Sequence, residues 1–411
     1  MSPVGSYESL MAAIQGGADA VYFGVGKLNM RAKSSNNFSI DDLIKITGIC
    51  KENNIKSYLT VNTIIYDHEI SEMKTVVDAA KANGISAIIA SDMAVLNYAK
   101  SVGMEIHMST QCNITNIEAV KFYANFADVM VTARELALKQ VAEIIEQIEI
   151  QQVRGPKGEL VKIEVFAHGA LCMAVSGKCY ISLDTLNSSA NRGACLQLCR
   201  RPYHVTDKDG GVEMEIDNEY IMSPKDLNTL GFLDKILKTG VKVLKIEGRG
   251  RSPEYVKTVT QCYKEASQAC FNGTYTEENI QKWNERLATV YNRGFWDGYY
   301  LGRKTGEWTE RYGSQATKKK VYVGKVTNYF AKLNVAEIKI ETHGLKLGEE
   351  IHIIGPTTGV YEDTLTEIRV DLNAVEVTVK GEVCSIPVKD VVRRQDKLYK
   401  IVENDAENED Y

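Results

Sequence analysis

The sequence predicts an α/β fold, a TIM-like (β/α) barrel, followed by a C-terminal small all-β barrel domain. Short apolar runs alternate with amphipathic stretches up to about residue 270. Beyond residue 320 the pattern changes to short alternating runs separated by turn residues, which is typical of a small β-barrel. The length of 411 residues also exceeds what one ordinary core accommodates. We assign residues 1–315 to the first barrel, 318–402 to the second, and 403–411 to an acidic tail that we expect to be disordered.

Eight apolar runs predict the buried parallel strands of the first barrel, because they are short and rich in Val, Ile, Tyr and Met. The runs are Ala20–Val25, Ser57–Asn62, Ala87–Ser91, Ile106–Ser109, Asp128–Thr132, Ile163–Ala167, Tyr220–Met222 and Val241–Ile246. Helical patterns lie between most of them. Ser39–Asp42 is a capping pattern, and Pro224 and Pro253 each stand where a helix can begin. This alternation predicts a (β/α)8 barrel, with a doubly wound open sheet as the alternative.

The composition excludes several classes of protein. The net charge is -5 and the pI is about 5.8, so any contact with nucleic acid requires a local basic patch. The amino-terminal stretch has no basic region followed by an apolar run, and no segment reaches the roughly 18 apolar residues of a membrane span. We therefore expect a cytoplasmic protein, in which structural disulfides are rare.

Four of the nine cysteines fall in one segment, an insertion at residues 172–219 that interrupts the barrel pattern. Cys172, Cys179, Cys195 and Cys199 have the spacing C-x6-C-x15-C-x3-C. Four thiolates suit an iron–sulfur cluster or a tetrahedral zinc ion. Zinc sites usually have paired C-x2-C knuckles, which are absent, so the spacing favours a cubane cluster over zinc and over unliganded thiols.

The position of the insertion indicates a role for it. Cys172 follows a predicted strand, and the loops after strands form the face of a barrel where active sites lie. The cluster would therefore border a catalytic cavity. Arg192, Arg200 and Arg201 lie nearby in the sequence. They are either solvated surface residues or positive charges that bind a phosphate or carboxylate beside the cluster.

The chain resembles the collagenase-like peptidase family (peptidase U-thirty-two) in several motifs that occur in a fixed order. The predicted strand before the insertion and the insertion itself carry EVFAHGALC at 164–172, SGKCYIS at 176–182 and NRGACLQLCR at 191–200. The other matching segments are Gly16–Gly24, Asn37–Ser39, Thr60–Thr63, Ser109–Gln111, Ala133–Glu135, Lys245–Arg249 and Asn292–Phe295. The resemblance covers residues 3 to 400. Only Pro3–Gly5 remains of the family's opening strand and turn, so we expect a shortened first strand and Ala20–Val25 as the second.

The family name implies proteolysis, but better characterised relatives resemble hydroxylases of RNA and of ubiquinone precursors. In these the same four cysteines are thought to hold a [4Fe–4S] cluster. One branch hydroxylates the wobble uridine of tRNA and requires prephenate, and another hydroxylates a cytidine of ribosomal RNA. The length of this chain is most similar to the tRNA branch (the TrhP type). The resemblance therefore implies 5-hydroxylation of a pyrimidine in a tRNA anticodon loop, whose unstacked bases are accessible.

The resemblance also suggests residues that act around the cluster. A dicarboxylate such as prephenate needs cationic partners or hydrogen-bond donors, and we expect these at or just beyond the strand ends. The candidates are Arg31, His107, Arg134, His168 and Arg249. Glu247 is a candidate acid or base, or the partner that orients Arg249. Structural ion pairs and ordinary strand-end histidines are the alternatives for these residues.

Contacts to an RNA substrate are expected from aromatic and basic residues. Tyr180, Tyr203 and Phe295 are candidates for stacking on the base, against the alternative of ordinary packing. The basic residues of the β domain, Lys318, Lys319, Lys320, Arg393 and Arg394, either hold phosphates or form a solvated face.

Two other functions remain open. The chain has neither the Gly-x-Ser-x-Gly nor the His-Glu-x-x-His motif of hydrolases, although Cys172 with His168 is a conceivable peptidase pair. A non-catalytic RNA-binding protein is the second alternative. The sequence makes no prediction of the oligomeric state.

Overall fold

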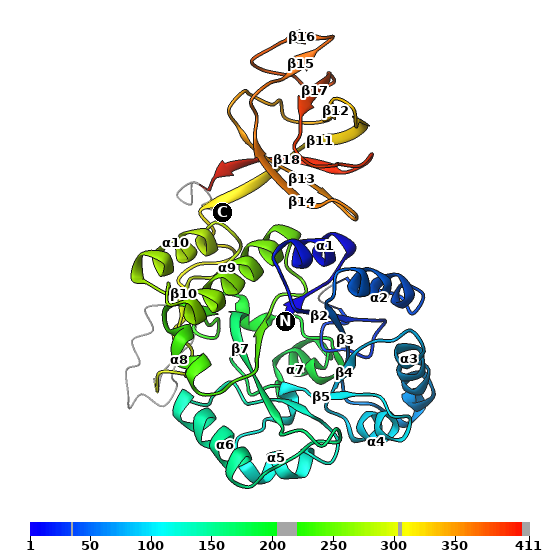
Figure 1. The fold of residues 1–411 in the computed structure, drawn as a ribbon, viewed down its shortest axis with the longest axis vertical. Helices are drawn as coiled ribbons and strands as arrows, with labels where there is room; N and C mark the ends of the chain where they lie inside the picture. The colour runs from blue at the N-terminus through cyan, green and yellow to red at the C-terminus, as the bar shows by residue number, and fades with distance from the viewer. Residues whose placement is uncertain (34–35, 204–219, 303–305, 405–411) are drawn as a thin grey trace.

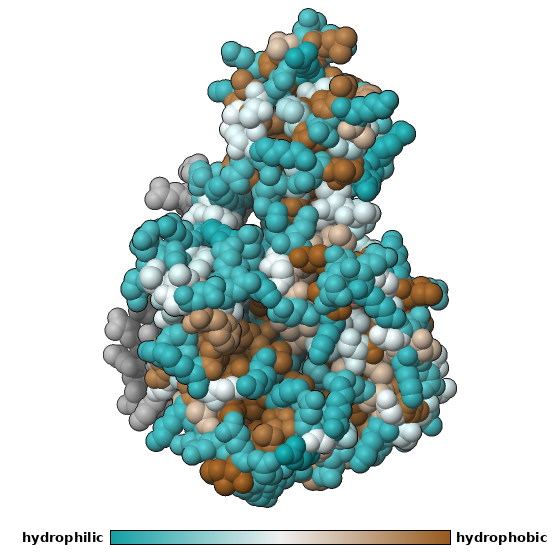
Figure 2. Space-filling view, in the orientation of Figure 1, coloured by the Kyte–Doolittle hydropathy of each residue, from teal (hydrophilic) through white to brown (hydrophobic). Residues whose placement is uncertain are grey.

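The computed structural model describes residues 1–33, 36–203, 220–302 and 306–404. Figure 1 shows a larger lobe, in which helices surround a curved sheet, and a smaller lobe of strands beside α1 and α9. Figure 2 shows hydrophilic residues over most of both lobes, with apolar residues gathered at the centre of the larger one. Residues 405–411 of the predicted tail and 204–219 of the predicted insertion lie outside the described residues, and Glu403, the first residue of the predicted tail, instead ends a strand.

The sheet of the larger lobe is mostly parallel, as the alternating pattern predicts. Its parallel strands are β1 (Ser2–Pro3), β2 (Ala20–Gly24), β3 (Lys56–Val61), β4 (Ala87–Ala90), β5 (Ile106–Met108), β6 (Val129–Val131), β7 (Lys162–Ala170) and β9 (Val243–Ile246). Each of β1 to β7 pairs with the next, and β9 pairs with β7. Met1 joins the two ends of this series: its amino group donates to the Leu244 carbonyl (2.8 Å), and the Ile246 N–H donates to the Met1 carbonyl (3.1 Å).

One strand prediction is wrong. Tyr220–Met222 forms a turn, and the strand at this point is β8 (Asp226–Asn228). It begins two residues after Pro224, so no helix begins at this proline. β8 pairs antiparallel with the last residues of β7 and parallel with β10 (Phe295–Trp296). β8 and β10 therefore add a short branch to the parallel series, which a regular (β/α)8 barrel does not have.

The packing explains why the strands alternate as they do. In β2, Val21 and Phe23 belong to the large core between the sheet and the helices, whereas Ala20 and Tyr22 belong to a small cluster with Tyr58 on the other face. Successive side chains of a strand point to opposite faces, so both faces of this sheet are buried. The polar side chains that lie among the second set form the floor of the site described below.

Ten helices lie within the described residues: α1 (Tyr7–Gln15), α2 (Asp42–Glu52), α3 (Ile70–Ala82), α4 (Met93–Ser101), α5 (Ile117–Tyr123), α6 (Leu138–Ile150), α7 (Ile181–Leu186), α8 (Leu233–Lys238), α9 (Pro253–Asn272) and α10 (Glu277–Ala288). The predicted capping pattern precedes α2, since Ser39 and Asp42 exchange hydrogen bonds (2.8 and 3.3 Å). Pro253 opens α9 as predicted, where its missing N–H costs nothing. None of these helices is both long and apolar enough to cross a membrane.

The smaller lobe is a separate antiparallel sheet with its own core. Its strands are β11 (Lys318–Phe330), β12 (Val335–Ile340), β13 (Glu350–Gly355), β14 (Gly359–Thr364), β15 (Arg369–Val370), β16 (Asn373–Ala374), β17 (Val383–Pro387) and β18 (Lys397–Glu403). Alternating residues such as Val323, Ile338 and Ile353 fill the core. Lys257 of α9 binds Glu362 of β14 (2.8 Å), and Gln15 of α1 binds the Thr358 carbonyl (2.9 Å), so polar contacts hold the lobes together.

Candidate functional site

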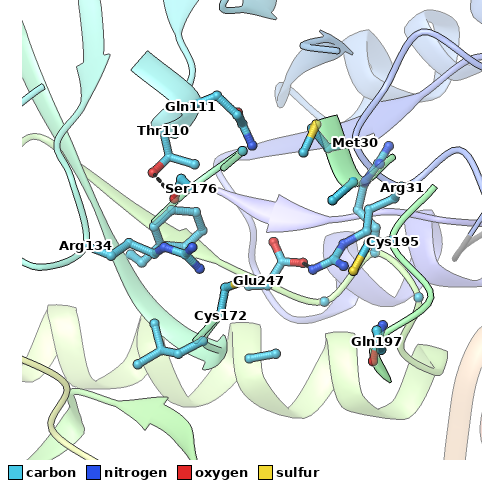
Figure 3. A pocket seen from close by; sticks show the side chains of 18 of the residues that line it. Met30, Arg31, Thr110, Gln111, Arg134, Cys172, Ser176, Cys195, Gln197 and Glu247 are labelled. Atoms are coloured by element: carbon cyan, nitrogen blue, oxygen red, sulfur yellow. Dashed lines mark hydrogen bonds and ion pairs between the residues drawn. The ribbon is translucent and has the colours of Figure 1, made fainter. Parts of the chain in front are cut away.

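A pocket of about 240 Å³ opens where the carboxyl ends of the parallel strands meet. Thr60 of β3, Gln111 after β5, Arg134 after β6 and Lys245 of β9 line it. The cysteine-rich segment supplies another part of the wall, from Leu171 to Arg200. In Figure 3, Arg134, Glu247 and Arg31 point toward the same space. The loops after the strands thus meet at one place, which is where active sites lie in parallel α/β folds.

All four predicted cysteine ligands line this pocket. The nine cysteines of the chain are free, and among these four Cys172 is exposed while the others are half-buried. Burial raises the pKa of the Cys199 thiol to about 11, although Arg200 acts in the opposite direction. Burial also raises the pKa of Cys179. In the metal-free chain these two side chains are therefore neutral thiols, and a bound cation would be needed to hold them as thiolates.

Glycines place the cysteine segment close to the loop after β2. Gly193 adopts φ 73°, and a Cβ at this residue would lie 2.2 Å from the Asn29 carbonyl oxygen. The Lys33 N–H donates to the Gly193 carbonyl (3.1 Å) and continues the contact. This close approach brings Cys195 beside Arg31, whose pKa is raised mainly by the carboxylate of Glu247. Figure 3 shows the Cys195 sulfur next to the Arg31–Glu247 pair.

The four thiols are of the donor type that holds iron–sulfur clusters, and all four line one pocket. A single tetrahedral Zn²⁺, with Zn–S bonds near 2.3 Å, would need its four sulfurs roughly 4 Å apart. The described part of the chain contains no group of three or more His, Cys, Asp and Glu side chains that would hold one metal ion. A larger cluster, bound at its corners by four cysteines, accepts wider spacing. The four residues that would hold it are Cys172, Cys179, Cys195 and Cys199.

Arg31 and Glu247 form an ion pair in the pocket wall. Arg31 Nη2 lies 2.7 Å from Glu247 Oε1, and the Tyr22 hydroxyl donates to Glu247 Oε2 (3.2 Å). Burial alone would raise the pKa of Glu247, but Arg31, Arg249 and Lys245 outweigh it and hold this pKa below its usual value. Glu247 is therefore an ionised partner of cations rather than a proton donor at neutral pH.

Arg249 lies deeper and is held rigidly. Its guanidinium donates to Thr60 Oγ1 (3.1 Å) and Asn29 Oδ1 (2.6 Å), and burial lowers its pKa to about 10. A Cβ on Gly24 would lie 2.3 Å from Arg249 Nη1, so only glycine leaves space for this side chain at the end of β2. Both Arg31 and Arg249 line the pocket, which agrees with their predicted position at strand ends.

Arg134 is the cation of this pocket without a hydrogen bond or ion pair to any described residue. Its guanidinium lies 5.8 Å from the centre of the Phe166 ring. The side chain lines the pocket and is partly exposed. A guanidinium in this state is available for a bound anion, and its fork geometry suits a carboxylate or a phosphate.

His107 does not line the pocket, contrary to the prediction. It lies inside the sheet, where its ring packs against Tyr58 (4.5 Å between centroids). Nδ1 lies 3.9 Å from Glu164 Oε2, and Glu164 binds Lys245 at 2.9 Å. Because β5 is only three residues long, His107 stands at the middle of the strand rather than at its end. It belongs to the polar floor beneath the pocket.

The prediction that His168 faces the cavity is also wrong. Its ring packs among Tyr255, Tyr263 and Phe295, with Nδ1 3.4 Å from the Tyr263 hydroxyl. β7 continues to Ala170, so the residue lies within the strand and on its helix-facing side. Burial, assisted by Arg251, lowers the pKa of His168 to about 3.

This shift predicts a pH dependence of stability. The unfolded chain binds a proton at His168 below about pH 6.5, whereas the folded chain does not until about pH 3, so stability falls as the pH falls between these values. Between pH 7 and pH 5 the contribution is about 2 kcal/mol. We expect His168→Gln to remove this pH-dependent contribution to the free energy of unfolding. The free energies of unfolding of wild type and variant, measured with urea, should therefore converge toward pH 5. A constant difference between them would contradict the assignment.

Arg192 is a third predicted site residue that lies elsewhere. Its guanidinium binds both carboxylate oxygens of Glu69 and lies 4.1 Å from the centre of the Tyr66 ring. It therefore fastens the cysteine segment to the loop after β3 and offers no free donor fork to a ligand. Arg200 does line the pocket, but it donates to the Ser223 hydroxyl and to the carbonyls of Pro224 and Leu171. Arg200 thus acts mainly as a brace for the loop that carries Cys199.

The aromatic residues predicted to stack on a base do not line this pocket. Tyr180 is 77% exposed outside it, the Tyr203 hydroxyl binds the Leu198 carbonyl (2.7 Å), and Phe295 packs on His168. Ordinary packing accounts for the last two.

The sequence reasoning missed a set of amide and hydroxyl groups in the wall. Asn62 donates to Ser109 Oγ (3.1 Å) and Gln111 Oε1 (3.2 Å), and its own oxygen accepts from the Met30 N–H. Thr110 and Ser176 share a hydrogen bond (3.3 Å) that ties the cysteine segment to β5. The motifs Thr60–Thr63 and Ser109–Gln111 were the available signal, since small polar residues directly followed two apolar runs.

Comparisons with known proteins identify the family of the chain. The family model described as Peptidase family U32 matches residues 5–310 of this chain. A protein named collagenase from Porphyromonas gingivalis is 61% identical over 400 residues, which are 97% of each chain. tRNA hydroxylation protein P1 of Bacillus subtilis is 29% identical over 90% of this chain and 86% of its own, and tRNA hydroxylation protein P of Helicobacter pylori is 32% identical over 74% and 71%. On this evidence, the chain belongs to peptidase family U32.

Proposed function

We propose that this protein is an iron–sulfur-dependent RNA hydroxylase, which converts a pyrimidine, the wobble uridine of tRNA, to its 5-hydroxy form with prephenate as the required metabolite. The observation that carries the proposal is that four free thiols share one pocket with Arg31, Glu247 and the free Arg134. The names of the tRNA hydroxylation relatives support the choice of RNA.

The residues of the pocket have distinct roles in this proposal. A [4Fe–4S] cluster held by the four cysteines would supply redox or Lewis-acid chemistry beside the bound pyrimidine. Arg134 binds a carboxylate of prephenate, because its donors are otherwise unused. Glu247 keeps Arg31 in place, and the fixed amide and hydroxyl groups of Asn62 and Gln111 are suited to the edge of a pyrimidine.

We also infer that the parallel sheet is a closed TIM-like barrel. The pairing of β9 with β7 and the bonds of Met1 to Leu244 and Ile246 support this inference, since they link the last parallel strand to the first. A closed barrel would leave its carboxyl end as the natural place for a site.

The alternative is a peptidase, which the name of the Porphyromonas gingivalis relative favours. A cysteine peptidase needs a histidine near the nucleophile. None of the residues lining the pocket in the described ranges is a histidine, and His168 points into the core. A peptidase would therefore have to use a base from another part of the chain.

The proposed reaction is tested by mass spectrometry of nucleosides from the tRNA of a strain that lacks the gene. We expect the 5-hydroxyuridine-derived nucleosides to disappear and to return on complementation with the intact gene. An unchanged nucleoside profile, together with cleavage of gelatin by the purified protein, would replace the hydroxylase by the peptidase.

Arg134 provides a prediction about the small substrate. We expect Arg134→Ala to weaken prephenate binding by about 10- to 100-fold, because one charge-assisted hydrogen bond contributes about 1.5–3 kcal/mol. Isothermal titration calorimetry with prephenate measures this change. Arg154→Ala is the matched control, since Arg154 is an exposed arginine that bonds only to residues of its own loop. Equal affinity of the Arg134 variant and wild type would remove Arg134 from the site.

A further inference from the structure

A second cavity of about 580 Å³ adjoins the first pocket. The two share four lining residues, Cys195, Gln197, Arg200 and Arg293. A ligand that occupies the first pocket can therefore extend into the second cavity and stay in contact with the protein. Neither the cysteine ligands nor the anion site of the first pocket requires this additional space.

The second cavity is lined by cations. Five of its lining residues are basic, namely Lys33, Arg200, Arg201, Arg293 and Arg311, and none of the lining residues that the structure describes is acidic. Arg200 is engaged as a brace, and Arg293 lies 3.6 Å from Asp226. The side chains of Lys33, Arg201 and Arg311 are exposed and make no hydrogen bond or ion pair within the described residues. Three free positive charges therefore surround one cavity in a chain whose net charge is -5.

An exposed aromatic ring accompanies these charges. Tyr312 follows Arg311 and is 71% exposed. The neighbouring Tyr291 is already covered, because the Arg251 guanidinium lies 3.7 Å from its ring centre. Tyr312 is thus the tyrosine of this cavity whose face is available to a planar ligand.

We propose that the second cavity binds the backbone of single-stranded RNA beside the nucleotide that enters the first pocket. Lys33, Arg201 and Arg311 contact phosphates, and Tyr312 stacks on an adjacent base. An acidic peptide would bind the same positive charges, but its carboxylate side chains offer no planar group that stacks on Tyr312. It also has no nucleotide base to place in the adjoining first pocket. This inference rests on the proposed function, because it takes RNA as the substrate.

The inference differs from the expectation that the β domain holds the phosphates. Lys318 binds Glu350 (2.5 Å), and Lys320 binds Glu254 (2.8 Å). These two lysines are therefore neutralised locally. Lys319, Arg393 and Arg394 remain exposed and form the competing surface.

The experiment measures binding of a fluorescein-labelled ten-nucleotide oligouridine to the full-length protein by fluorescence anisotropy, at several KCl concentrations. We expect Lys33→Gln combined with Arg201→Gln and Arg311→Gln to weaken binding at least tenfold at low salt. The slope of log affinity against log salt should decrease by about 2, because each phosphate contact on a single strand contributes roughly 0.7. If the triple variant fails to fold, the single change Arg201→Glu reverses one of these three charges and should also weaken binding of the oligouridine.

Two further variants distinguish the components of the surface. Tyr312→Leu should weaken binding roughly tenfold without changing the salt slope, and Tyr312→Phe should restore it, since a phenyl ring still stacks. Replacing Lys319, Arg393 and Arg394 together with glutamine should leave the affinity within twofold. Loss of binding in this β-domain variant, with no loss in the first, would overturn the inference.

A decaglutamate peptide serves as a polyanion of another class. We expect it to compete weakly with oligouridine, and equal competition would overturn the assignment to RNA. The binding measurement involves no turnover, so its result is independent of the nucleoside profile. If the tRNA nucleoside profile of the deletion strain is unchanged while the variants bind as predicted, only the proposed reaction is contradicted. If that profile changes while the variants bind like wild type, only the RNA subsite is contradicted.

Discussion

Single replacement of Cys172, Cys179, Cys195 or Cys199 by serine is expected to lower the iron content of anaerobically purified protein from about four atoms per chain to below one. The hydroxylated nucleosides should be absent when such a variant complements the deletion strain. The physical reason is that each thiolate of a cubane cluster holds one corner, and serine is a hard, weakly acidic ligand that does not replace it. Iron assay and nucleoside mass spectrometry measure the two effects.

Cys270→Ser is the matched control for this series. Cys270 is a half-buried thiol on α9 that does not line the pocket. The control should keep both its iron and its activity. Full iron content in any of the four pocket variants would show that the corresponding cysteine is not a ligand, and full content in all four would remove the cluster from this site.

Lys245→Met is expected to destabilise the larger lobe by about 3–5 kcal/mol, the usual cost of leaving one buried charge without its partner. Lys245 Nζ lies 2.9 Å from Glu164 Oε1, and their side chains are 7% and 0% exposed. The second oxygen of Glu164 has no hydrogen-bond donor, so removal of the ammonium group would leave the whole carboxylate unpaired. Urea unfolding followed by tryptophan fluorescence measures the effect in this lobe, because Trp283, Trp296 and Trp308 all belong to it.

Two comparisons make this prediction specific. Glu164→Gln combined with Lys245→Met should recover most of the loss, because the double variant contains no unpaired charge. Lys238→Met breaks an exposed pair, in which Lys238 is 76% exposed and 2.7 Å from Asp234, and should cost at most about 0.5 kcal/mol. If Lys245→Met were as mild as this control, the pair would not be desolvated in solution.

Much of the fold follows from short-range patterns. Seven of the eight predicted strand segments correspond to strands, because a buried parallel strand must be apolar on both faces and is therefore visible as a continuous run. The expected shortened first strand is present as β1. All four cysteines line one pocket, since their segment directly follows β7, while a metal centre shared by their sulfurs stays a prediction.

The errors have a common physical origin in long-range pairing. β8 contains Asp226 and Asn228, so no apolar run announces it, and it is a strand because β7 and β10 flank it. Arg192 and Arg134 are both arginines near the expected site, and local sequence does not distinguish them. Only the fold shows that Glu69, 123 residues away, neutralises Arg192 and that Arg134 meets no comparable partner among the residues that the structure describes.

The contact of Gly193 with Asn29 has a consequence for how the pocket responds to its ligands. Because residue 193 is a glycine, the backbone of the Cys195 loop packs directly against the backbone of the Arg31 loop, with no side chain of residue 193 between them. Any displacement of one loop is therefore transmitted to the other through this close approach and the hydrogen bond from Lys33 to Gly193. If the proposed cluster binds these sulfurs, its binding and the orientation of the Arg31 guanidinium should change together, so that cluster-free protein should bind anions with a different affinity.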